Sequence, residues 1–321
     1  MRAWQVCELG DPADVLELVD VPEPVPGPDQ LRVRVDAVAL NFPDVLLCQG
    51  KYQERPPLPF TPGQEVCATV LDGPRAGERV LGSTPAPHGG LAEQALMPVT
   101  SAFPVPDGMP DAKAASLFIT YQTGHVGLHR RAQLREGETL LVHAGAGGVG
   151  SAAIQLGRAA GARVIATAGG PEKVQVCRDL GADVVVDYLA EDFVAVVKDA
   201  TEGRGADVVY DSVGGDVFDK SRRCVAFEGR IVVVGFAGGR IADAPTNHAL
   251  VKNYSVVGLH WGLYRTYEPE IFARTHEALV RLWEAGAIDP LVGAELPLED
   301  APAALARLAS RGTVGKVVLT P

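Results

Sequence analysis

A glycine-rich turn between a strand-like run and a helix-like run constrains this chain more than any other feature. Gly145, Gly147 and Gly150 follow the apolar run TLLVHA and open the helical pattern VGSAAIQLGRAAG. From there, helical patterns alternate with short apolar runs, and strands are predicted at TLLVHA, RVIATA, DVVVDY, DVVYDS, RIVVVGF and YSVVGL. This alternation predicts an α/β fold: a parallel, doubly wound Rossmann sheet with helices on both faces. We expect residues 118–264 to form this domain.

The turn has the spacing G-x-G-x-x-G, which in this context is typical of a loop that binds the pyrophosphate of a dinucleotide. Gly145 permits the sharp turn, Gly147 lets the backbone approach the phosphates, and Gly150 allows the helix to pack closely on the strand. The helix N-terminus offers free N–H groups and a partial positive charge. The predicted cofactor-binding residues here are Gly145, Ala146, Gly147, Gly148, Val149 and Gly150.

The first 117 residues have a different pattern of apolar and turn-forming residues. Short apolar runs such as LRVRVDAVAL and EVCATVL are separated by clusters of Pro and Gly. This pattern predicts many short strands in a small barrel or sandwich. After the helical pattern PEIFARTHEALVRLWEAGA, the tail becomes strand-like again at LVGAELPL and GKVVLTP. We therefore expect residues 1–117 to form a β-rich domain to which residues 265–321 return.

Composition and charge narrow the range of functions. The chain has 321 residues, of which 47% are hydrophobic and 21% charged, and this excludes a disordered protein. The net charge of −11 argues against a nucleic-acid partner. Five scattered cysteines without a C-x-x-C pair favour free thiols in a reducing, cytoplasmic compartment. The N-terminus lacks a signal-peptide core, and the longest uncharged run, residues 139–157, is rich in glycine, so no membrane segment is expected.

The end of the second strand of the α/β domain discriminates between dinucleotides. An NAD site usually carries Asp or Glu there, to bind the ribose 2′-OH. Here the strand runs from Ala166 through Gly169 to Gly170 without an acid, and Lys173 follows. We predict NADPH as the cofactor, with Gly169, Lys173 and Tyr188 at its adenosine end. The alternative that Lys173 is a solvated residue of the helix stays open at this point.

The motifs together resemble the medium-chain dehydrogenase/reductase superfamily, in particular its zinc-free quinone oxidoreductase branch, which includes zeta-crystallin-like proteins. The resemblance spans nearly the whole chain. Besides the glycine turn, it is carried by NFPD, GKY, PFTPG, LGADVVVDY, VVYDSVGG, GRIVVVGFAGG, KNYSVVGLHWG and TVGKVVL. It implies a GroES-like catalytic domain joined to the Rossmann domain. It also implies a homodimer, and pairing of the strand YSVVGL across a two-fold axis is the expected interface.

The resemblance shows where zinc ligands would stand in the zinc-dependent relatives. Their Cys ligand belongs to the segment that reads AVALNFPD here, and this segment contains no Cys. Their His ligand belongs to a Gly-His-Glu motif, which reads Gly63, Gln64 and Glu65 here. A catalytic zinc needs three protein ligands. We therefore predict no metal site.

Without a metal, the predicted chemistry is direct hydride transfer from the nicotinamide to an electron-poor acceptor. The resemblance implies that Asn41 hydrogen-bonds the nicotinamide ribose or the substrate carbonyl, and that Tyr52 polarises a carbonyl or donates a proton. Read without the resemblance, Asn41 could be a turn residue and Tyr52 a packing aromatic. The remaining cofactor-binding residues that it implies are Thr123, Val213, Phe236 and, near the phosphates, Lys316.

The predicted function is reduction of a quinone or a similar small molecule by NADPH. Two alternatives stay open. One is reduction of the activated C=C bond of an enone, an enal or an enoyl thioester, which needs a proton donor for carbon, and Tyr52 is the one candidate. The other is a cofactor-binding protein with a non-catalytic role.

Overall fold

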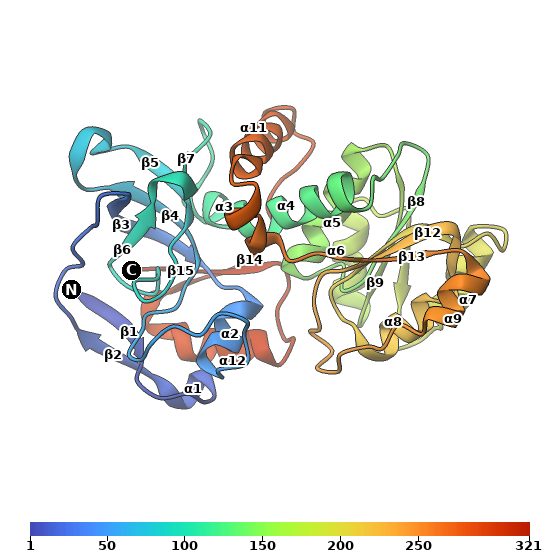
Figure 1. Ribbon diagram of the computed structural model, residues 1–321, viewed down its shortest axis with the longest axis horizontal. Helices are drawn as coiled ribbons and strands as arrows, with labels where there is room; N and C mark the ends of the chain where they lie inside the picture. Colours follow the sequence, from blue (N-terminus) through green and yellow to red (C-terminus); the bar gives the residue numbers. More distant parts are fainter. The chain divides into compact units, whose positions relative to one another are not determined.

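The computed structural model describes all residues from Met1 to Pro321. The chain divides into two compact units (Figure 1). Unit 1 comprises Met1–Ile119 and Pro290–Pro321, and unit 2 comprises Thr120–Asp289. None of the helices combines the length and the apolar character that crossing a membrane requires.

Unit 2 contains a six-stranded sheet in which every neighbouring pair is parallel. Its order is β10-β9-β8-β11-β12-β13. The six predicted strands are confirmed as β8 (Thr139–Val142), β9 (Arg163–Ala168), β10 (Val184–Asp187), β11 (Ala206–Asp211), β12 (Val225–Val233) and β13 (Ser255–Gly258). The chain starts at β8 in the middle, runs outward through β9 and β10, and returns to β11 on the other side. Ligands of such sheets bind at the carboxyl ends of the strands beside this point of reversal.

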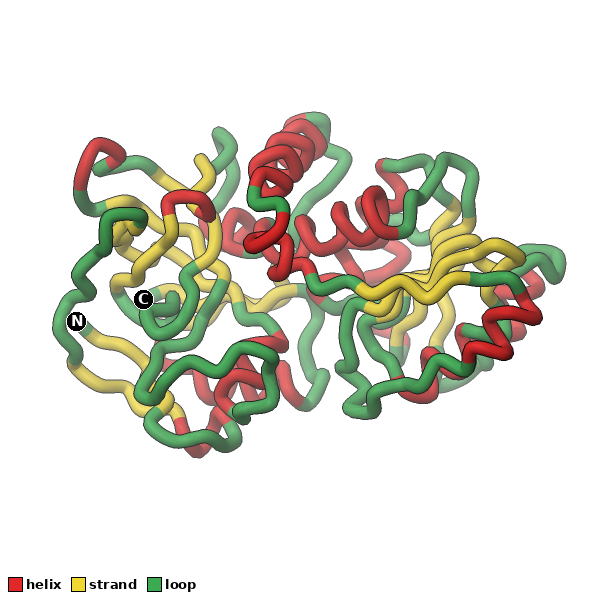
Figure 2. The backbone as a smooth tube through the Cα atoms, viewed as in Figure 1, coloured by secondary structure: helices red, strands yellow, loops and turns green.

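Helices cover both faces of the sheet, as the doubly wound prediction requires (Figure 2). The side chains of a strand alternate between the two faces. Leu140 and Val164 lie against Gly157 of α5 (Gly148–Ala159), which packs on one face with α6 (Pro171–Asp179). Leu141 and Ile165 belong to the core cluster that also contains residues of α7 (Phe193–Ala200) and α8 (Gly215–Ser221). The Rossmann prediction is therefore confirmed.

The C-terminal boundary of unit 2 differs from the prediction. Residues 265–289 were expected in the first domain, yet they belong to unit 2. They include α11 (Glu270–Glu284), which buries an apolar face there. Gln122 of α4 (Phe118–His125) donates to the carbonyl of Phe272, at 3.3 Å. Gln155 of α5 donates to the carbonyl of Asp289, at 2.8 Å. These contacts hold the segment in unit 2, and the return to unit 1 begins only at Pro290.

Unit 1 is built on a seven-stranded sheet of order β14-β15-β3-β4-β5-β7, with β6 also paired to β3, and on the hairpin β1-β2. The strands are β1 (Arg2–Val6), β2 (Leu16–Asp20), β3 (Gln30–Ala39), β4 (Glu65–Val70), β5 (Arg79–Ser83), β6 (Gln94–Pro98), β7 (Ala102–Pro104), β14 (Val292–Pro297) and β15 (Lys316–Thr320). The helices are α1 (Pro12–Val15), α2 (Phe42–Cys48), α3 (Asp111–Ala115) and α12 (Ala301–Ala309). Strand β15 pairs antiparallel with β3, so the end of the chain lies beside the start of α2.

Candidate functional site

The glycine turn of unit 2 lies at the carboxyl edge of the sheet, between β8 and α5. The N–H of His143 donates to the carbonyl of Tyr210 in β11, at 3.1 Å. The N–H of Gly145 donates to the carbonyl of Thr167 in β9, at 2.9 Å. Between these two anchors Ala144 has a φ of 51°, a left-handed conformation that is unusual for a residue with a side chain. The sharp turn predicted at Gly145 is thus made by Ala144, and the turn is held from both neighbouring strands.

The three motif glycines have different roles in the packing. A Cβ on Gly150 would lie 2.1 Å from the carbonyl oxygen of Ala144, and one on Gly145 would lie 2.8 Å from Cys177 Sγ. The protein's own packing therefore requires both of these glycines. A Cβ on Gly147 would meet only the oxygen of Ala144, at 3.3 Å. The bare backbone at Gly147 is consequently open to close approach by a ligand.

The first turn of α5 has unsatisfied donors. Gly147 is the N-cap residue, and no side chain accepts a hydrogen bond there. The N–H groups of Gly148 and Val149 have no acceptor within the chain. Free N–H groups combined with the positive end of the helix dipole suit a phosphate group. The turn therefore fits the pyrophosphate of a dinucleotide.

The residues predicted for the adenosine end lie at the same edge of the sheet, after β9 and β10. Tyr188 is 52% exposed, and its ring lies against Gly169, where a Cβ would be 2.6 Å from the tyrosine oxygen. Lys173 is half-buried in the first turn of α6. A further residue of this edge, not predicted from the sequence, is Asp187, the last residue of β10, whose Oδ1 accepts the N–H of Gly170 at 3.0 Å. A search for acids limited to the end of β9 could not find it.

The loops after β11 and β12 contact each other at this edge. Ala237 donates to the carbonyl of Ser212 at 3.1 Å, and Gly238 donates to that of Val213 at 2.8 Å. Phe236 is 38% exposed. The structure thus brings Val213 and Phe236 to the carboxyl edge that carries the glycine turn. Thr123 is buried in α4.

His143 is buried at the end of β8, next to the glycine turn. Its Nε2 lies 2.8 Å from Ser221 Oγ, and its Nδ1 lies 3.0 Å from Thr167 Oγ1. The Ser221 hydroxyl donates to the carbonyl of Val217, so Nε2–H donates to Ser221 and Nδ1 accepts from Thr167. Burial lowers the pKa of His143 to about 4. The imidazole is therefore neutral at pH 7, and it fixes the start of the turn.

Unit 1 contains a buried cluster in which charges are paired. Lys316 Nζ donates to Asn41 Oδ1 at 2.6 Å and to Glu65 Oε2 at 2.8 Å. Asn41 Nδ2 donates to Glu65 Oε2 at 3.0 Å and to the carbonyl of Ala39 at 3.1 Å. The other carboxylate oxygen of Glu65 accepts the N–H of Ile119 at 2.7 Å. Lys316, Asn41 and Glu65 are 4%, 6% and 0% exposed.

A second buried carboxylate, that of Asp44, completes the charged cluster of Lys316, Asn41 and Glu65. Asp44 Oδ2 accepts the N–H of Asn41 at 2.8 Å, and Oδ1 accepts the N–H of Gly63 at 3.1 Å. These bonds fix the start of α2 against the loop before β4. Burial raises the pKa of Asp44 to about 6, although the backbone N–H groups and the charge of Lys316 act in the opposite direction.

This cluster changes the roles expected of Lys316 and Asn41. Lys316 was expected near the phosphates of the cofactor, but its ammonium group is enclosed with Glu65 and Asn41 inside unit 1. Both N–H donors of the Asn41 amide are used within the same cluster. Both side chains therefore hold the start of α2 in place. Tyr52 is half-buried and packs against the hydrophobic core of unit 1.

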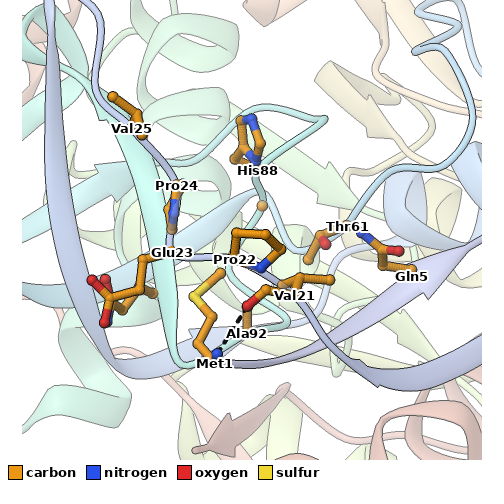
Figure 3. Close-up of a pocket in the computed structure, with 12 residues that line it drawn as sticks. Met1, Gln5, Val21, Pro22, Glu23, Pro24, Val25, Thr61, His88 and Ala92 are labelled. Atoms are coloured by element: carbon orange, nitrogen blue, oxygen red, sulfur yellow. Dashed lines mark hydrogen bonds between the residues drawn. The ribbon is translucent and has the colours of Figure 1, made fainter.

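A cavity of about 300 Å³ in unit 1 is lined mainly by Met1, residues 21–25 and the segment from His88 to Gln94 (Figure 3). The amino group of Met1 donates to the carbonyl of Val21 at its edge, at 2.9 Å. None of the predicted site residues lines this cavity. It therefore takes no part in the candidate site.

Comparison with known proteins identifies the family. The model of the alcohol dehydrogenase GroES-like domain matches residues 27–107, and that of the zinc-binding dehydrogenase matches residues 148–277. A quinone oxidoreductase-like protein 2 homolog from Nematostella vectensis is 37% identical over 326 residues, which cover 99% of this chain and 88% of that protein. The chain belongs to the quinone oxidoreductase branch of the medium-chain dehydrogenase/reductase superfamily. The predicted family and the GroES-like domain are thus confirmed.

Two solved quinone oxidoreductases have the same fold. The Escherichia coli enzyme, complexed with NADPH, superposes with a TM-score of 0.92 at 29% identity, and the alignment covers 100% of both chains. The Thermus thermophilus enzyme, also studied as its NADPH complex, gives a TM-score of 0.88 at 35% identity, again over 100% of both chains.

The donor atoms of unit 1 do not fit the zinc ion that one family description names. Gln64 stands beside Glu65, and no group of three or more His, Cys, Asp or Glu side chains is arranged to hold a metal. The ammonium group of Lys316 already pairs with Glu65. A metal ion at this position would add a second positive charge next to that ammonium, and its donor set would be incomplete.

Proposed function

We propose that this chain is an NADPH-dependent oxidoreductase that transfers a hydride to a quinone or to a similarly electron-poor acceptor, without zinc. The observation that carries the proposal is the open turn at Gly147, above an uncapped helix N-terminus, in a member of the quinone oxidoreductase family. The relatives from E. coli and T. thermophilus form complexes with NADPH. The same cofactor is proposed here.

NADPH supplies a hydride when bound, and a quinone that takes up this hydride and one proton becomes a hydroquinone. The chain's own residues bind and orient the cofactor. Residues 145–150 receive the pyrophosphate, and the free N–H groups of Gly148 and Val149 bind its oxygens. The proposed adenosine contacts are Gly169, Lys173 and Tyr188, and those on the nicotinamide side are Thr123, Val213 and Phe236.

Two glycine variants test the dinucleotide site. Gly147→Ala should fold with a free energy of unfolding within about 1 kcal/mol of wild type, because its Cβ would meet only the oxygen of Ala144, at 3.3 Å, which needs to move by no more than a few tenths of an ångström. It should weaken NADPH binding at least about tenfold, because the methyl group blocks close approach of the pyrophosphate. Gly150→Ala is the control that should be clearly destabilised, since its Cβ would lie 2.1 Å from a backbone oxygen. Denaturant unfolding and titration with NADPH measure the two effects.

Turnover with a panel of quinones and enones then identifies the acceptor. Tyr52→Phe distinguishes the classes, because protonation of carbon needs a placed acid, whereas the oxygens of a hydroquinone exchange protons with water. Loss of enone reduction in this variant would favour C=C reduction. A wild type that binds NADPH but reduces no member of the panel would contradict the enzymatic proposal, as would a Gly147→Ala variant that binds NADPH as wild type does.

A homodimer that forms through β13 is the proposed assembly. This strand is the edge of the unit 2 sheet, and Val256 in it is 39% exposed. Nearby apolar side chains of β12 and α9 (Thr246–Lys252) are more exposed still, with Phe227 at 69% and Val251 at 76%. Val256→Lys should give a monomer in light scattering, whereas Val25→Lys, which places the same charge on an exposed valine of unit 1, should leave the dimer intact. A dimeric Val256→Lys protein would contradict this interface.

A cytoplasmic location is also proposed. All five cysteines are free, and four of them are buried. Free thiols are typical of proteins in a reducing compartment.

A further inference from the structure

We propose that Asp187 limits the preference of this chain for NADPH over NADH by opposing Lys173 at the adenosine end of the dinucleotide site. The inference rests on the proposed function and concerns the strength of its cofactor selectivity. The strand pairing provides the first observation. Strand β10 pairs with β9 in parallel, and Asp187 is level with Ala168, the last residue of β9. A carboxylate from the neighbouring strand thus stands beside a strand end that carries no acid of its own.

The contacts of Asp187 show what this carboxylate does. Its Oδ1 accepts the N–H of Gly170 and the N–H of Leu189, both at 3.0 Å. Gly170 is the N-cap residue of α6, has a φ of 84° and has no side chain to cap the helix. Asp187 therefore accepts the N–H of the N-cap residue, as the N3 side chain of a capping box does. The N–H that a 2′-phosphate could otherwise use is already occupied, while Oδ2 makes no hydrogen bond within the chain.

The carboxylate and the lysine favour different cofactors. An acid at this edge accepts a hydrogen bond from a free ribose 2′-OH and repels a 2′-phosphate. A lysine in the first turn of the following helix attracts the phosphate. Asp187 and Lys173 are both half-buried, so salt screens their charges less than those of fully exposed groups. The wild-type preference for NADPH is accordingly smaller than Lys173 alone would give.

Two fragments of the cofactors measure this balance on the full-length chain. Adenosine 2′,5′-bisphosphate and adenosine 5′-monophosphate differ only in the 2′-phosphate, and neither contains nicotinamide. Asp187→Asn keeps an oxygen for the N–H of Gly170 but removes the charge. It should raise the ratio of the two affinities in favour of the bisphosphate by about tenfold in calorimetric titration. Lys173→Ala should lower the same ratio by a similar factor.

Asp183→Asn is the matched control. Asp183 lies just before β10, at the opposite edge of the sheet, where its carboxylate accepts the N–H of Val164 at 2.7 Å. The variant removes the same charge and should leave the ratio unchanged. Asp187→Ser, whose hydroxyl can also accept the N–H of Gly170, should shift the ratio in the same direction as Asp187→Asn if the latter folds poorly.

The outcomes separate this inference from the proposed function. If Asp187→Asn and Asp187→Ser change the ratio no more than Asp183→Asn does, while wild type binds NADPH, the role of Asp187 is overturned and the dinucleotide site stands. If wild type binds neither fragment nor NADPH, both proposals are overturned. A ratio that rises in the Asp187 variants alone supports the inference.

Discussion

The two units differ in how the buried polar groups beside their predicted site residues are partnered. In unit 1, the ammonium group of Lys316 and the carboxylate of Glu65 form a buried ion pair, joined through Asn41 to the carboxyl group of Asp44. In unit 2, the groups that hydrogen-bond to His143 are neutral hydroxyls, and the buried carboxylate of Asp211 near it has no cation beside it but accepts the backbone N–H groups of Val213 and Gly214. A buried charge is stable only while its partner is present, whereas neutral groups need only their hydrogen bonds. Single substitutions should therefore be costly in the charged cluster, and tolerated in the glycine turn where no packing opposes them.

The largest effect is expected for Lys316→Met. This change leaves the carboxylate of Glu65 buried without its partner, and should lower the free energy of unfolding by about 3–5 kcal/mol. Adding Glu65→Gln should recover much of the loss, because the unpaired charge is then gone. Urea unfolding of the single and double variants measures both effects. If Lys316→Met instead keeps the stability of wild type and weakens NADPH binding, the ammonium group contacts the cofactor. That result would contradict a purely structural role for the ion pair of unit 1.

The buried, neutral imidazole of His143 should contribute less to the free energy of unfolding as the pH falls. The pKa of His143 is about 4 in the folded chain, below its usual value of 6.5. Its contribution is complete above pH 6.5 and is lost as the pH falls towards 4, in total about 3 kcal/mol. His143→Gln loses this contribution, so the free energy of unfolding of wild type minus that of the variant, measured by urea titration, should fall by about 3 kcal/mol from pH 7 to pH 4. A difference that does not change with pH would contradict the lowered pKa of His143.

The contribution of Asp44 to the free energy of unfolding should change with pH in the direction opposite to that of His143. Its folded pKa of about 6 lies above its usual value of 3.8, so its contribution is complete below pH 3.8 and is lost as the pH rises through 6. The total contribution of Asp44 to the free energy of unfolding is slightly smaller than that of His143, again about 3 kcal/mol. In wild type the two slopes largely offset each other between pH 4 and 6. Asp44→Asn, although less stable throughout, should expose the His143 slope in the same urea titrations, and a variant that keeps the wild-type profile would contradict the raised pKa.

The smallest effect is expected for metal removal. Because the buried cation of unit 1 is an ammonium group, purified protein should contain well under one zinc per chain. Treatment with a chelator should leave the rate of NADPH oxidation unchanged. Elemental analysis and a turnover assay check this, and stoichiometric zinc required for turnover would refute it.

The sequence predicted the site in unit 2 better than the cluster in unit 1 for a physical reason. The glycine turn is contiguous, and its spacing follows directly from the backbone geometry that a pyrophosphate requires. The six strands around it were equally visible, because buried parallel strands are almost wholly apolar. The cluster of unit 1, in contrast, joins Lys316 to Asn41 and Glu65 across 275 and 251 positions of the chain. No local pattern marks such a contact, so the resemblance alone supplied a role for Lys316.

Two further misses have the same origin. Asp187 reaches the end of β9 through the register of β10, and a search along one strand does not see its neighbour. Residues 265–289 looked like part of the returning tail because α11 has an apolar face that any partner could cover. Contacts within unit 2, among them the hydrogen bonds from Gln122 and Gln155, place it there, and no local pattern of the sequence shows them.

The pairing of β15 with β3 has a consequence for the order in which the chain folds. Unit 2 is one continuous segment, Thr120–Asp289, and its sheet can close while the chain is still being synthesised. Unit 1 is interrupted by this segment, and its sheet gains β14 and β15 only after residues 292–320 have been synthesised. Until then Glu65 has no cation beside it. In the nascent chain, unit 2 can therefore be complete while unit 1 is still incomplete. The contacts of unit 1 that join residues far apart in the sequence form slowly, and they form after those of unit 2.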